Sequence, residues 1–236
     1  MTESGNNGNS LCSRTMPAIV AFAKNPEVEP VKTRLAASLG PDAARKLYCS
    51  LLSDCLHSLS NLDKVKRFIA CSTSSDHPYF RKLASKYGVE LVEQRGENLG
   101  SRMLSCIEEL SIRFKPVILV GTDVPILPID DVRLALTDTD LWDVLLGPTY
   151  DSGYYLVAMD KPHAEVFAEV DWSTDKVLRQ TRENCTRHQL KVKELPTALD
   201  VDDVGSLLHL AHILQKNPDY ARSTRQVLNE LGISIF

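Results

Sequence analysis

The chain has 236 residues, of which 43% are hydrophobic and 25% are charged, and its formal net charge is -4 at pH 7. This length and composition are typical of one large, globular α/β domain. The acidic balance argues against a broad nucleic-acid or membrane-surface footprint, so we expect the partners to be small molecules.

The N-terminal stretch is rich in Gly, Asn and Ser and lacks the apolar segment of a secretory signal. We expect a disordered arm over 1–16 and one domain over 17–236. No later run is long enough to cross a bilayer, and the six cysteines show neither a CxxC pair nor metal-ligand spacing. These features predict reduced thiols in a cytoplasmic protein.

Apolar runs of strand length then alternate with segments of helical periodicity. The predicted strands are AIVAFAK (18–24), RFIACST (67–73), VELVE (89–93), PVILVGTD (116–123), DVLLG (143–147), GYYLVAM (153–159) and KVKEL (191–195). The predicted helices cover 41–59, 78–87, 100–114, 128–137, 173–187 and two C-terminal segments divided by Pro218. This alternation predicts a mostly parallel sheet with helices on both faces.

A carboxylate follows the deeply apolar strand in the stretch VILVGTDVP. Open α/β sheets bind ligands at the carboxyl ends of their strands, and Asp123 lies at such an end. A carboxylate there is costly to desolvate unless it is solvated, caps the chain or coordinates a cation. Asp123 is therefore a candidate metal ligand; the alternative is that it only turns the chain before Pro125.

Further acids follow two other strands. Asp151 lies in a Gly- and Pro-containing loop between strands, and Asp200 and Asp202 precede a helix. Mg²⁺ or Mn²⁺ is usually held by one or two carboxylates together with water and phosphate oxygens, so two aspartates from separate loops would suffice. The alternatives are a turn role for Asp151 and a helix-capping role for Asp203.

The first loop supplies the opposite charge. AKNPEVEPVKTRLAASLG presents Lys24, Lys32, Thr33 and Arg34 ahead of a helical run, and basic side chains near a helix start suit phosphate. Neither GxxxxGK[ST] nor GxGxxG occurs, which argues against P-loop and dinucleotide sites. The alternative is that Lys32 and Arg34 are an ordinary solvated pair.

Six motifs occur in a family-specific order: FAK…VKTRLA, NLGSRM, VGTDVP, LLGPTYDSGYYLVAM, DWSTDKVLRQT and LDVDD. From about Ala18 to Ala211 the chain resembles the radical-SAM/selenodomain-associated transferases, also described as arsenosugar-biosynthesis-type glycosyltransferases. The resemblance implies a single-domain, Rossmann-like GT-A nucleotide-diphospho-sugar transferase fold, related to molybdopterin and phospholactate nucleotidyltransferases. The family usually reads EDGGYYL where this chain has YDSGYYL, so we expect a different acceptor pocket at Tyr150 and Ser152.

The resemblance also implies residue roles, with Mg²⁺ or Mn²⁺ held by Asp123 and Asp202. The expected nucleotide-binding residues are Ala23, Lys24, Lys32, Arg34, Gly100, Arg102, Thr122 and Asp123. The expected acceptor- or sugar-binding residues are Asp151, Gly153, Tyr154, Trp172, Thr174 and Asp175. Lys32 and Arg34 would stabilise the leaving diphosphate, and Asp151 is the candidate base for the acceptor hydroxyl. The alternative for DWSTDKVL is a helix start, with Ser173 as N-cap and Trp172 in the core.

The predicted function is metal-dependent glycosyl transfer from a nucleotide-diphosphate sugar to a small-molecule acceptor. The usual DxD motif is missing, because Val124 and Pro125 follow Asp123. One alternative is therefore a nucleotidyltransferase that moves NMP from an NTP to a phosphorylated small molecule and releases pyrophosphate. A second alternative is a non-catalytic nucleotide-binding module. The nucleobase, sugar, acceptor, stereochemical outcome and choice between monomer and homodimer stay open.

Overall fold

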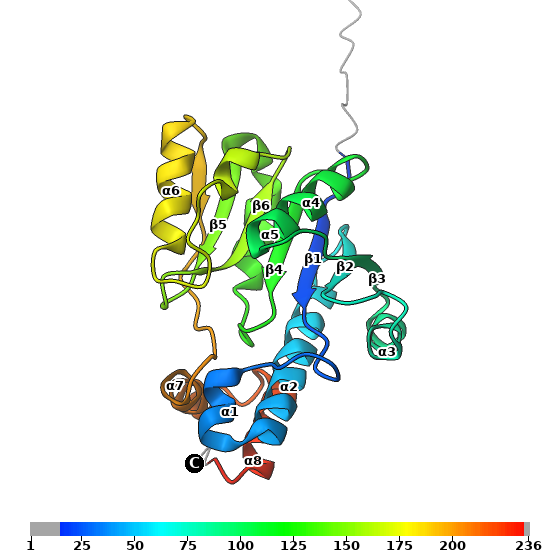
Figure 1. The fold of residues 1–236 in the computed structure, drawn as a ribbon, viewed down its shortest axis with the longest axis vertical. Coiled ribbons are helices and arrows are strands. Elements are labelled where there is room, and N and C mark those ends of the chain that lie inside the picture. The colour runs from blue at the N-terminus through cyan, green and yellow to red at the C-terminus, as the bar shows by residue number, and fades with distance from the viewer. Residues whose placement is uncertain (1–14, 234–236) are drawn as a thin grey trace, which may run out of the picture.

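The structure is a computed structural model and describes residues 15–233 (Figure 1). The disordered arm predicted over 1–16 falls mostly on residues 1–14, which lie outside the described residues. The strands are β1 (Ala18–Ala23), β2 (Lys66–Cys71), β3 (Glu90–Glu93), β4 (Val117–Gly121), β5 (Val144–Pro148), β6 (Tyr154–Met159) and β7 (Val192–Glu194). They form one seven-stranded sheet in the order β3-β2-β1-β4-β6-β5-β7.

The sheet is parallel apart from β6. β1 pairs in parallel with β2 and β4, and β5 pairs in parallel with β7. β6 runs antiparallel between β4 and β5. Residues 149–153, which connect β5 to β6, are too few for the crossover that parallel neighbours require. The predicted mostly parallel sheet is confirmed.

Helices cover both faces of the sheet. The helices are α1 (Thr33–Leu39), α2 (Pro41–Ser60), α3 (Pro78–Tyr87), α4 (Leu99–Ser111), α5 (Ile129–Thr137), α6 (Val177–Arg187), α7 (Val204–Lys216) and α8 (Arg222–Glu230), with short 3-10 turns η1 (Thr139–Leu141) and η2 (Ala164–Phe167). Successive residues of a strand point to opposite faces. Ile19 and Ala21 of β1 accordingly pack with α2, α3 and α5, whereas Ala18 and Val20 pack with α4 and α6.

One predicted helix boundary is wrong. The helix expected over 173–187 begins only at Val177, and its N-cap is Lys176 rather than Ser173. Ser173 has a left-handed backbone with φ 64°, which does not continue into a helix. Thr174 then forms a turn, because its Oγ1 donates to the Asp171 carbonyl at 2.7 Å and accepts from the Lys176 amide at 3.2 Å.

A third hydrophobic core lies beyond the carboxyl ends of the parallel strands. It joins α1, the first half of α2, α7 and α8 through buried side chains such as Leu35, Leu51 and Leu210. In Figure 1, α1, α7 and α8 lie together at the end of the molecule toward which the β1 arrow points. The loops that leave this edge of the sheet therefore lie between the sheet and a layer of helices.

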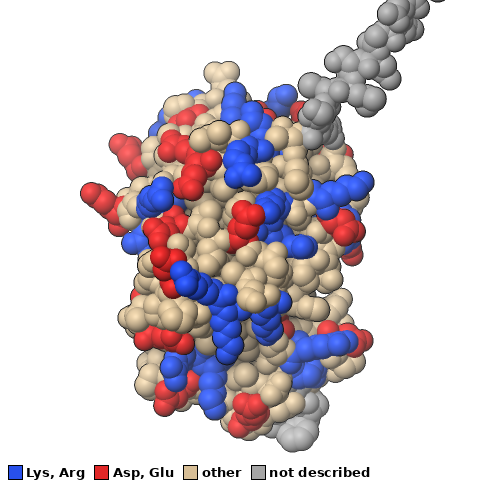
Figure 2. Space-filling view, turned by 90° about the vertical axis from the view of Figure 1, so that its right-hand side faces the viewer, with Lys and Arg blue, Asp and Glu red and all other residues tan. Residues whose placement is uncertain are grey.

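The surface, the helix lengths and the cysteines also bear on the predictions from the sequence. The face drawn in Figure 2 carries Lys and Arg side chains interspersed with Asp and Glu. Over residues 15–233, every helix is too short or too polar to span a bilayer. The described cysteines are free thiols: Cys49, Cys55, Cys71, Cys106 and Cys185.

Candidate functional site

Backbone contacts join the three acid-bearing loops. The Val201 amide donates to the Asp123 carbonyl at 2.9 Å, which brings the segment before α7 against the end of β4. Thr149 forms a parallel bridge with Ala198, which adds the loop between β5 and β6. Loops that are far apart in the sequence therefore meet at the edge where the parallel strands end.

Lys32 lies at the point where two of the predicted acids converge. Its Nζ is 2.7 Å from Asp123 Oδ1 and 3.9 Å from Asp202 Oδ1, and its side chain is only 2% exposed. The ammonium makes these ion contacts without a hydrogen bond of regular geometry to a described residue. The two carboxylates are 47% and 39% exposed, so both remain open to solvent and to a ligand.

Arg34 completes the basic side of the site. Its Nη1 lies 3.1 Å from Asp202 Oδ2, but its side chain is 68% exposed. An ion pair this exposed contributes little to folding stability, so Arg34 can exchange its partner at low cost. Lys32 is the N-cap of α1 and Arg34 lies in its first turn, and both side chains contact Asp202.

Asp200 is an acid of the site that the predicted metal set left out. Partial burial raises its pKa to about 6, and the charges of Asp151 and Asp123 add to this rise, whereas Lys32 opposes it. The LDVDD motif could have indicated this residue, because side chains two positions apart on an extended segment point to the same face. Asp200 and Asp202 are spaced in this way.

The charge of the cluster fits a divalent cation. Asp200 lies within the electrostatic influence of Asp151 and Asp123, and Lys32 and Arg34 pair with Asp123 and Asp202. Within residues 15–233, no group of three His, Cys, Asp or Glu side chains is placed to hold a metal by itself. A cation held by Asp123 and Asp202 would need phosphate and water oxygens as further ligands, as is usual for Mg²⁺.

Tyr48 of α2 anchors the first loop and was not predicted as a site residue. Its hydroxyl accepts from the Lys24 amide at 2.7 Å and donates to the Lys24 carbonyl at 3.1 Å. Burial, and next the negative charge of Asp123, raise the pKa of this phenol. In the sequence Tyr48 is one of several apolar positions at helical spacing, which gives no sign of its contact with the loop.

The other predicted nucleotide-binding residues lie around the ends of β1, β3 and β4. Ala23 and Thr122 are buried at strand ends, while the Lys24 side chain is exposed. Gln94 Nε2 donates to the Ala23 carbonyl at 3.3 Å, which ties the loop after β3 to β1. From that loop, the Gly96 carbonyl accepts from Arg102 Nε at 3.0 Å.

Gly100 and Trp172 pack against each other. A Cβ on Gly100 would lie 2.5 Å from Trp172 Cζ2, so only glycine permits this contact at the start of α4. Trp172 is half-buried and its ring centroid is 6.3 Å from that of Phe167. Its environment is that of the packing alternative, although part of the indole remains accessible.

The predicted acceptor residues are divided between the surface and the core. Asp151 Oδ1 accepts from Thr149 Oγ1 at 2.6 Å and from the Gly153 amide at 3.0 Å, which is the turn role considered as its alternative. The hydroxyl of Tyr154 is buried in the core, so it is not presented to a ligand. Thr174 is occupied in its turn, and Asp175 is exposed beside it.

Asp203 has the structural role considered for it. Its side chain accepts from the Ser206 amide at 2.8 Å and caps α7. The capping interaction lowers the pKa of Asp203. Asp202 and Asp203 are therefore adjacent in sequence but differ in role, since only Asp202 faces Lys32 and Arg34.

Comparison with known proteins identifies the family. Residues 55–174, just over half of the chain, match the family described as "Uncharacterized protein conserved in bacteria (DUF2064)". The chain belongs to the DUF2064 family. No curated protein matches this DUF2064 protein.

Solved structures share its fold. A candidate nucleotide-diphospho-sugar transferase from Desulfovibrio desulfuricans G20 is 32% identical with a TM-score of 0.83, covering 93% of this chain and 96% of that chain. 4-Diphosphocytidyl-2C-methyl-D-erythritol synthase from Anaerococcus prevotii DSM 20548 is 10% identical with a TM-score of 0.58, covering 85% and 96%. The inositol-1-phosphate CTP transferase from T. maritima is 13% identical with a TM-score of 0.55, covering 91% and 97%.

These matches confirm the predicted nucleotide-diphospho-sugar transferase fold for the DUF2064 protein. The two distant structures show a shared fold only. The radical-SAM and arsenosugar association implied by the motif resemblance receives no support from any of the three.

Proposed function

We propose that this DUF2064 protein is a divalent-cation-dependent glycosyltransferase that uses a nucleotide-diphosphate sugar and a small-molecule acceptor. The observation that carries the proposal is the convergence of Asp123 and Asp202 on the Lys32 ammonium at the carboxyl edge of the sheet. The 32% identical structure, described as a candidate nucleotide-diphospho-sugar transferase, supports the same reaction class.

Each residue has a role that its position supports. Asp123 and Asp202 hold Mg²⁺ or Mn²⁺, which neutralises charge on the diphosphate when bound. Lys32 and Arg34 bind diphosphate oxygens and stabilise the negative charge that develops as the sugar–oxygen bond breaks. Lys24 and Arg102 are further cationic candidates at the rim of the nucleotide site.

The acceptor side is assigned to the loop between β5 and β6. Asp151 uses one carboxylate oxygen in its turn, and its other oxygen has no hydrogen bond to a described residue. That oxygen takes the acceptor proton as the acceptor oxygen bonds to the sugar carbon, and the bonding electron pair leaves with the diphosphate. The Leu178 amide donates to the Ser152 carbonyl at 3.0 Å, which ties this loop to the start of α6, the helix that follows Trp172 and Asp175 in the chain.

Nucleotidyl transfer is the second candidate. It is favoured by the replacement of the DxD motif by Asp123, Val124 and Pro125. In that reaction a phosphorylated acceptor attacks the α-phosphorus of an NTP and pyrophosphate leaves. The same cation and the same basic side chains would serve both reactions, so product analysis has to separate them.

The test is incubation of the protein with Mg²⁺ or Mn²⁺ and separate panels of nucleotide-diphosphate sugars and NTPs. Release of a nucleoside diphosphate supports glycosyl transfer, and release of pyrophosphate supports the second candidate. Binding is measured in parallel by thermal shift, which should vanish when EDTA is added. A shift that EDTA leaves unchanged would contradict cation dependence, and the absence of both products and shifts would refute the transferase proposal.

Matched variants separate the site from the fold. Asp123→Asn should abolish the cation-dependent shift, whereas Asp203→Asn should retain it, because asparagine caps a helix about as well as aspartate. Lys32→Met should weaken donor binding more than Arg34→Met, since Lys32 is 2% exposed and Arg34 is 68% exposed. Equal losses in the two basic variants would contradict the central position of Lys32.

A further inference from the structure

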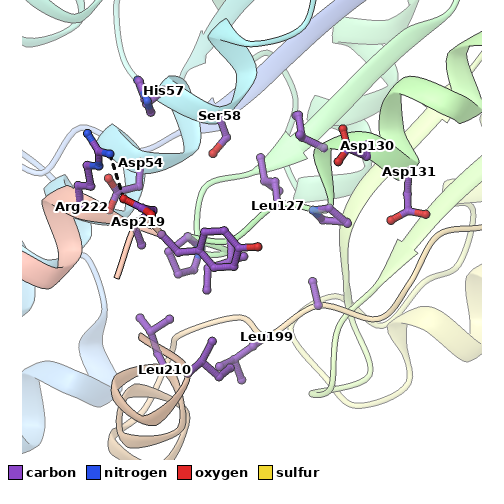
Figure 3. A pocket seen from close by; sticks show the side chains of 18 of the residues that line it. Asp54, His57, Ser58, Leu127, Asp130, Asp131, Leu199, Leu210, Asp219 and Arg222 are labelled. Atoms are coloured by element: carbon purple, nitrogen blue, oxygen red, sulfur yellow. Dashed lines mark hydrogen bonds and ion pairs between the residues drawn. The ribbon is translucent and has the colours of Figure 1, made fainter. Parts of the chain in front are cut away.

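A cavity of about 690 Å³ lies beside the candidate site (Figure 3). It is enclosed by the second half of α2, residues 125–131, residues 197–199, α7 and the start of α8. Its volume is in the range of small-molecule sites. Its lining contains none of the acids or basic residues assigned above to the cation and the diphosphate.

The cavity shares its walls with the acid-bearing loops. Pro125, Tyr150 and Leu199 line it, and they lie within two residues of Asp123, Asp151 and Asp200 in the chain. Consecutive Cα atoms are about 3.8 Å apart, so along each of these loops the backbone of an acid lies only a few ångströms from a residue that lines the cavity. A ligand in the cavity would therefore contact the loops that position the proposed reaction.

Most of the charged side chains of the lining have partners. Asp54 accepts from the Ser223 and Thr224 amides at 2.9 and 2.8 Å and thereby holds the start of α8. The dashed line in Figure 3 joins Arg222 to Asp219, and these atoms are 3.3 Å apart. The lining thus contains one arginine and no lysine, against four aspartates: Asp54, Asp130, Asp131 and Asp219.

Asp130, which also lines the cavity, pairs with Arg133 of the same helix. Asp131 has neither an ion pair nor a hydrogen bond with a residue of the described part of the chain. An unpaired carboxylate repels anions and accepts hydrogen bonds from hydroxyl groups. The charge pattern of the cavity consequently disfavours a phosphorylated ligand.

Apolar and aromatic groups make up most of the remaining wall. Leu127 and Leu210 project into the cavity from opposite sides in Figure 3, and Ser58 faces it from α2. Two tyrosines, Tyr150 at 69% exposure and Tyr220 at 49%, add aromatic surface and hydroxyl groups. Aromatic side chains with exposed faces suit the apolar faces of sugars and aryl rings.

We propose that this cavity binds a small uncharged molecule with an apolar body and hydroxyl groups. Such a molecule is either the acceptor of the proposed transferase or an effector that acts on the shared loops, and its chemistry is the same in both cases. Only the choice between acceptor and effector rests on the proposed function. The binding of such a molecule to the cavity does not depend on it.

Two matched probes test the ligand class. Phenyl β-D-glucoside has an apolar ring and hydroxyl groups without charge, whereas phenyl phosphate has the same ring with an anionic group. We expect the glucoside to shift the backbone amide NMR signals of His57, Tyr150 and Leu199, and phenyl phosphate to bind about tenfold more weakly or not at all. The titrations are run at pH 8, above the usual titration range of histidine.

Plugging variants locate the binding. Ser58→Trp fills the cavity from α2 and should weaken glucoside binding by about tenfold or more, a loss of roughly 1.4 kcal/mol or more. Ser85→Trp, on an exposed position of α3 away from the cavity, is the matched control and should bind like the wild type. His209→Trp plugs the cavity from α7 and replaces Ser58→Trp if that variant does not fold.

The outcomes are distinct. Any of three results would overturn the proposal. The first is the absence of shifts in these amides up to the solubility limit of the glucoside, and the second is equal binding of phenyl phosphate. The third is undiminished glucoside binding in both plugging variants when they are folded. These titrations contain no donor or cation, so their result stands even if the transferase proposal fails. Once a donor is found, a product that contains the glucoside identifies the acceptor, and unchanged glucoside identifies an effector.

Discussion

Replacing Asp200 with asparagine should stabilise the ligand-free protein at pH 8. The pKa of this carboxyl rises from 3.8 to about 6 because of partial burial and the nearby charges of Asp151 and Asp123. Above pH 6 the Asp200 carboxylate is ionised in the folded protein, and this ionisation costs more free energy there than in the unfolded chain. Asparagine keeps the shape of the side chain and removes that charge.

The size of the effect follows from the pKa. A rise of about two pH units corresponds to at most about 3 kcal/mol. Asp200 is partly exposed, and solvent screens its repulsion, so we expect a gain of about 1–2 kcal/mol in the free energy of unfolding. A raised carboxyl pKa destabilises the fold above the folded value, and this destabilisation disappears as the pH falls from about 6 to below the unfolded value.

Urea denaturation at pH 8 and pH 4.5 provides the measurement. Asp200→Asn should be more stable than the wild type at pH 8, and most of the difference should be lost at pH 4.5. Asp203→Asn is the control, because capping lowers the pKa of Asp203 and asparagine also caps a helix, so this variant should show no gain in stability at pH 8. A loss of stability in Asp200→Asn that is the same at both pH values would refute the reasoning, since it would show a structural hydrogen bond rather than repulsion.

Two further variants test the packing around the site. Gly100→Ala should lower the free energy of unfolding, measured by urea denaturation, by about 1–3 kcal/mol, because the added Cβ would meet Trp172 at 2.5 Å. Gly205→Ala is the control, because its added Cβ would have its nearest contact at 3.4 Å. This variant should lose less than about 1 kcal/mol or be stabilised, in line with helix propensity. Similar losses in the two glycine variants would contradict the close contact. Tyr48→Phe should lose about 1 kcal/mol by leaving the Lys24 amide and carbonyl without the phenol, and should also weaken nucleotide binding; unchanged stability would show that water replaces the hydroxyl.

The sequence predicted the fold well where local physics decides the structure. The helix predicted over 78–87 has these bounds in the structure, where α3 ends at Tyr87 and Gly88 follows in a left-handed conformation at φ 62°. The direction of β6 was not predicted, although the five residues between β5 and β6 allow only a hairpin. The start of α6 was misplaced because Ser173 has a left-handed backbone, which helical periodicity in the sequence does not reveal.

The candidate site was predicted at the level of loops rather than of atoms. Their position at strand ends places Asp123, Asp151 and Asp202 at one edge, and the structure joins these loops by backbone contacts. The contact between Lys32 and Asp123 could not be predicted, because it depends on how α1 packs beyond the sheet. The burial of the Tyr154 hydroxyl was also missed, because the motif does not show that the two tyrosines pack in cores on opposite faces of the sheet.

The position of the Lys32 ammonium has a consequence for the order in which ligands enter. An amine held between two aspartates already serves as their counter-ion, so an incoming metal has to displace it. The amine in turn needs a new anionic neighbour once it leaves, because a buried cation without one is costly. Bare Mg²⁺ should therefore gain little by entering alone, whereas a metal–nucleotide complex supplies the replacement cation and the new anion in the same event.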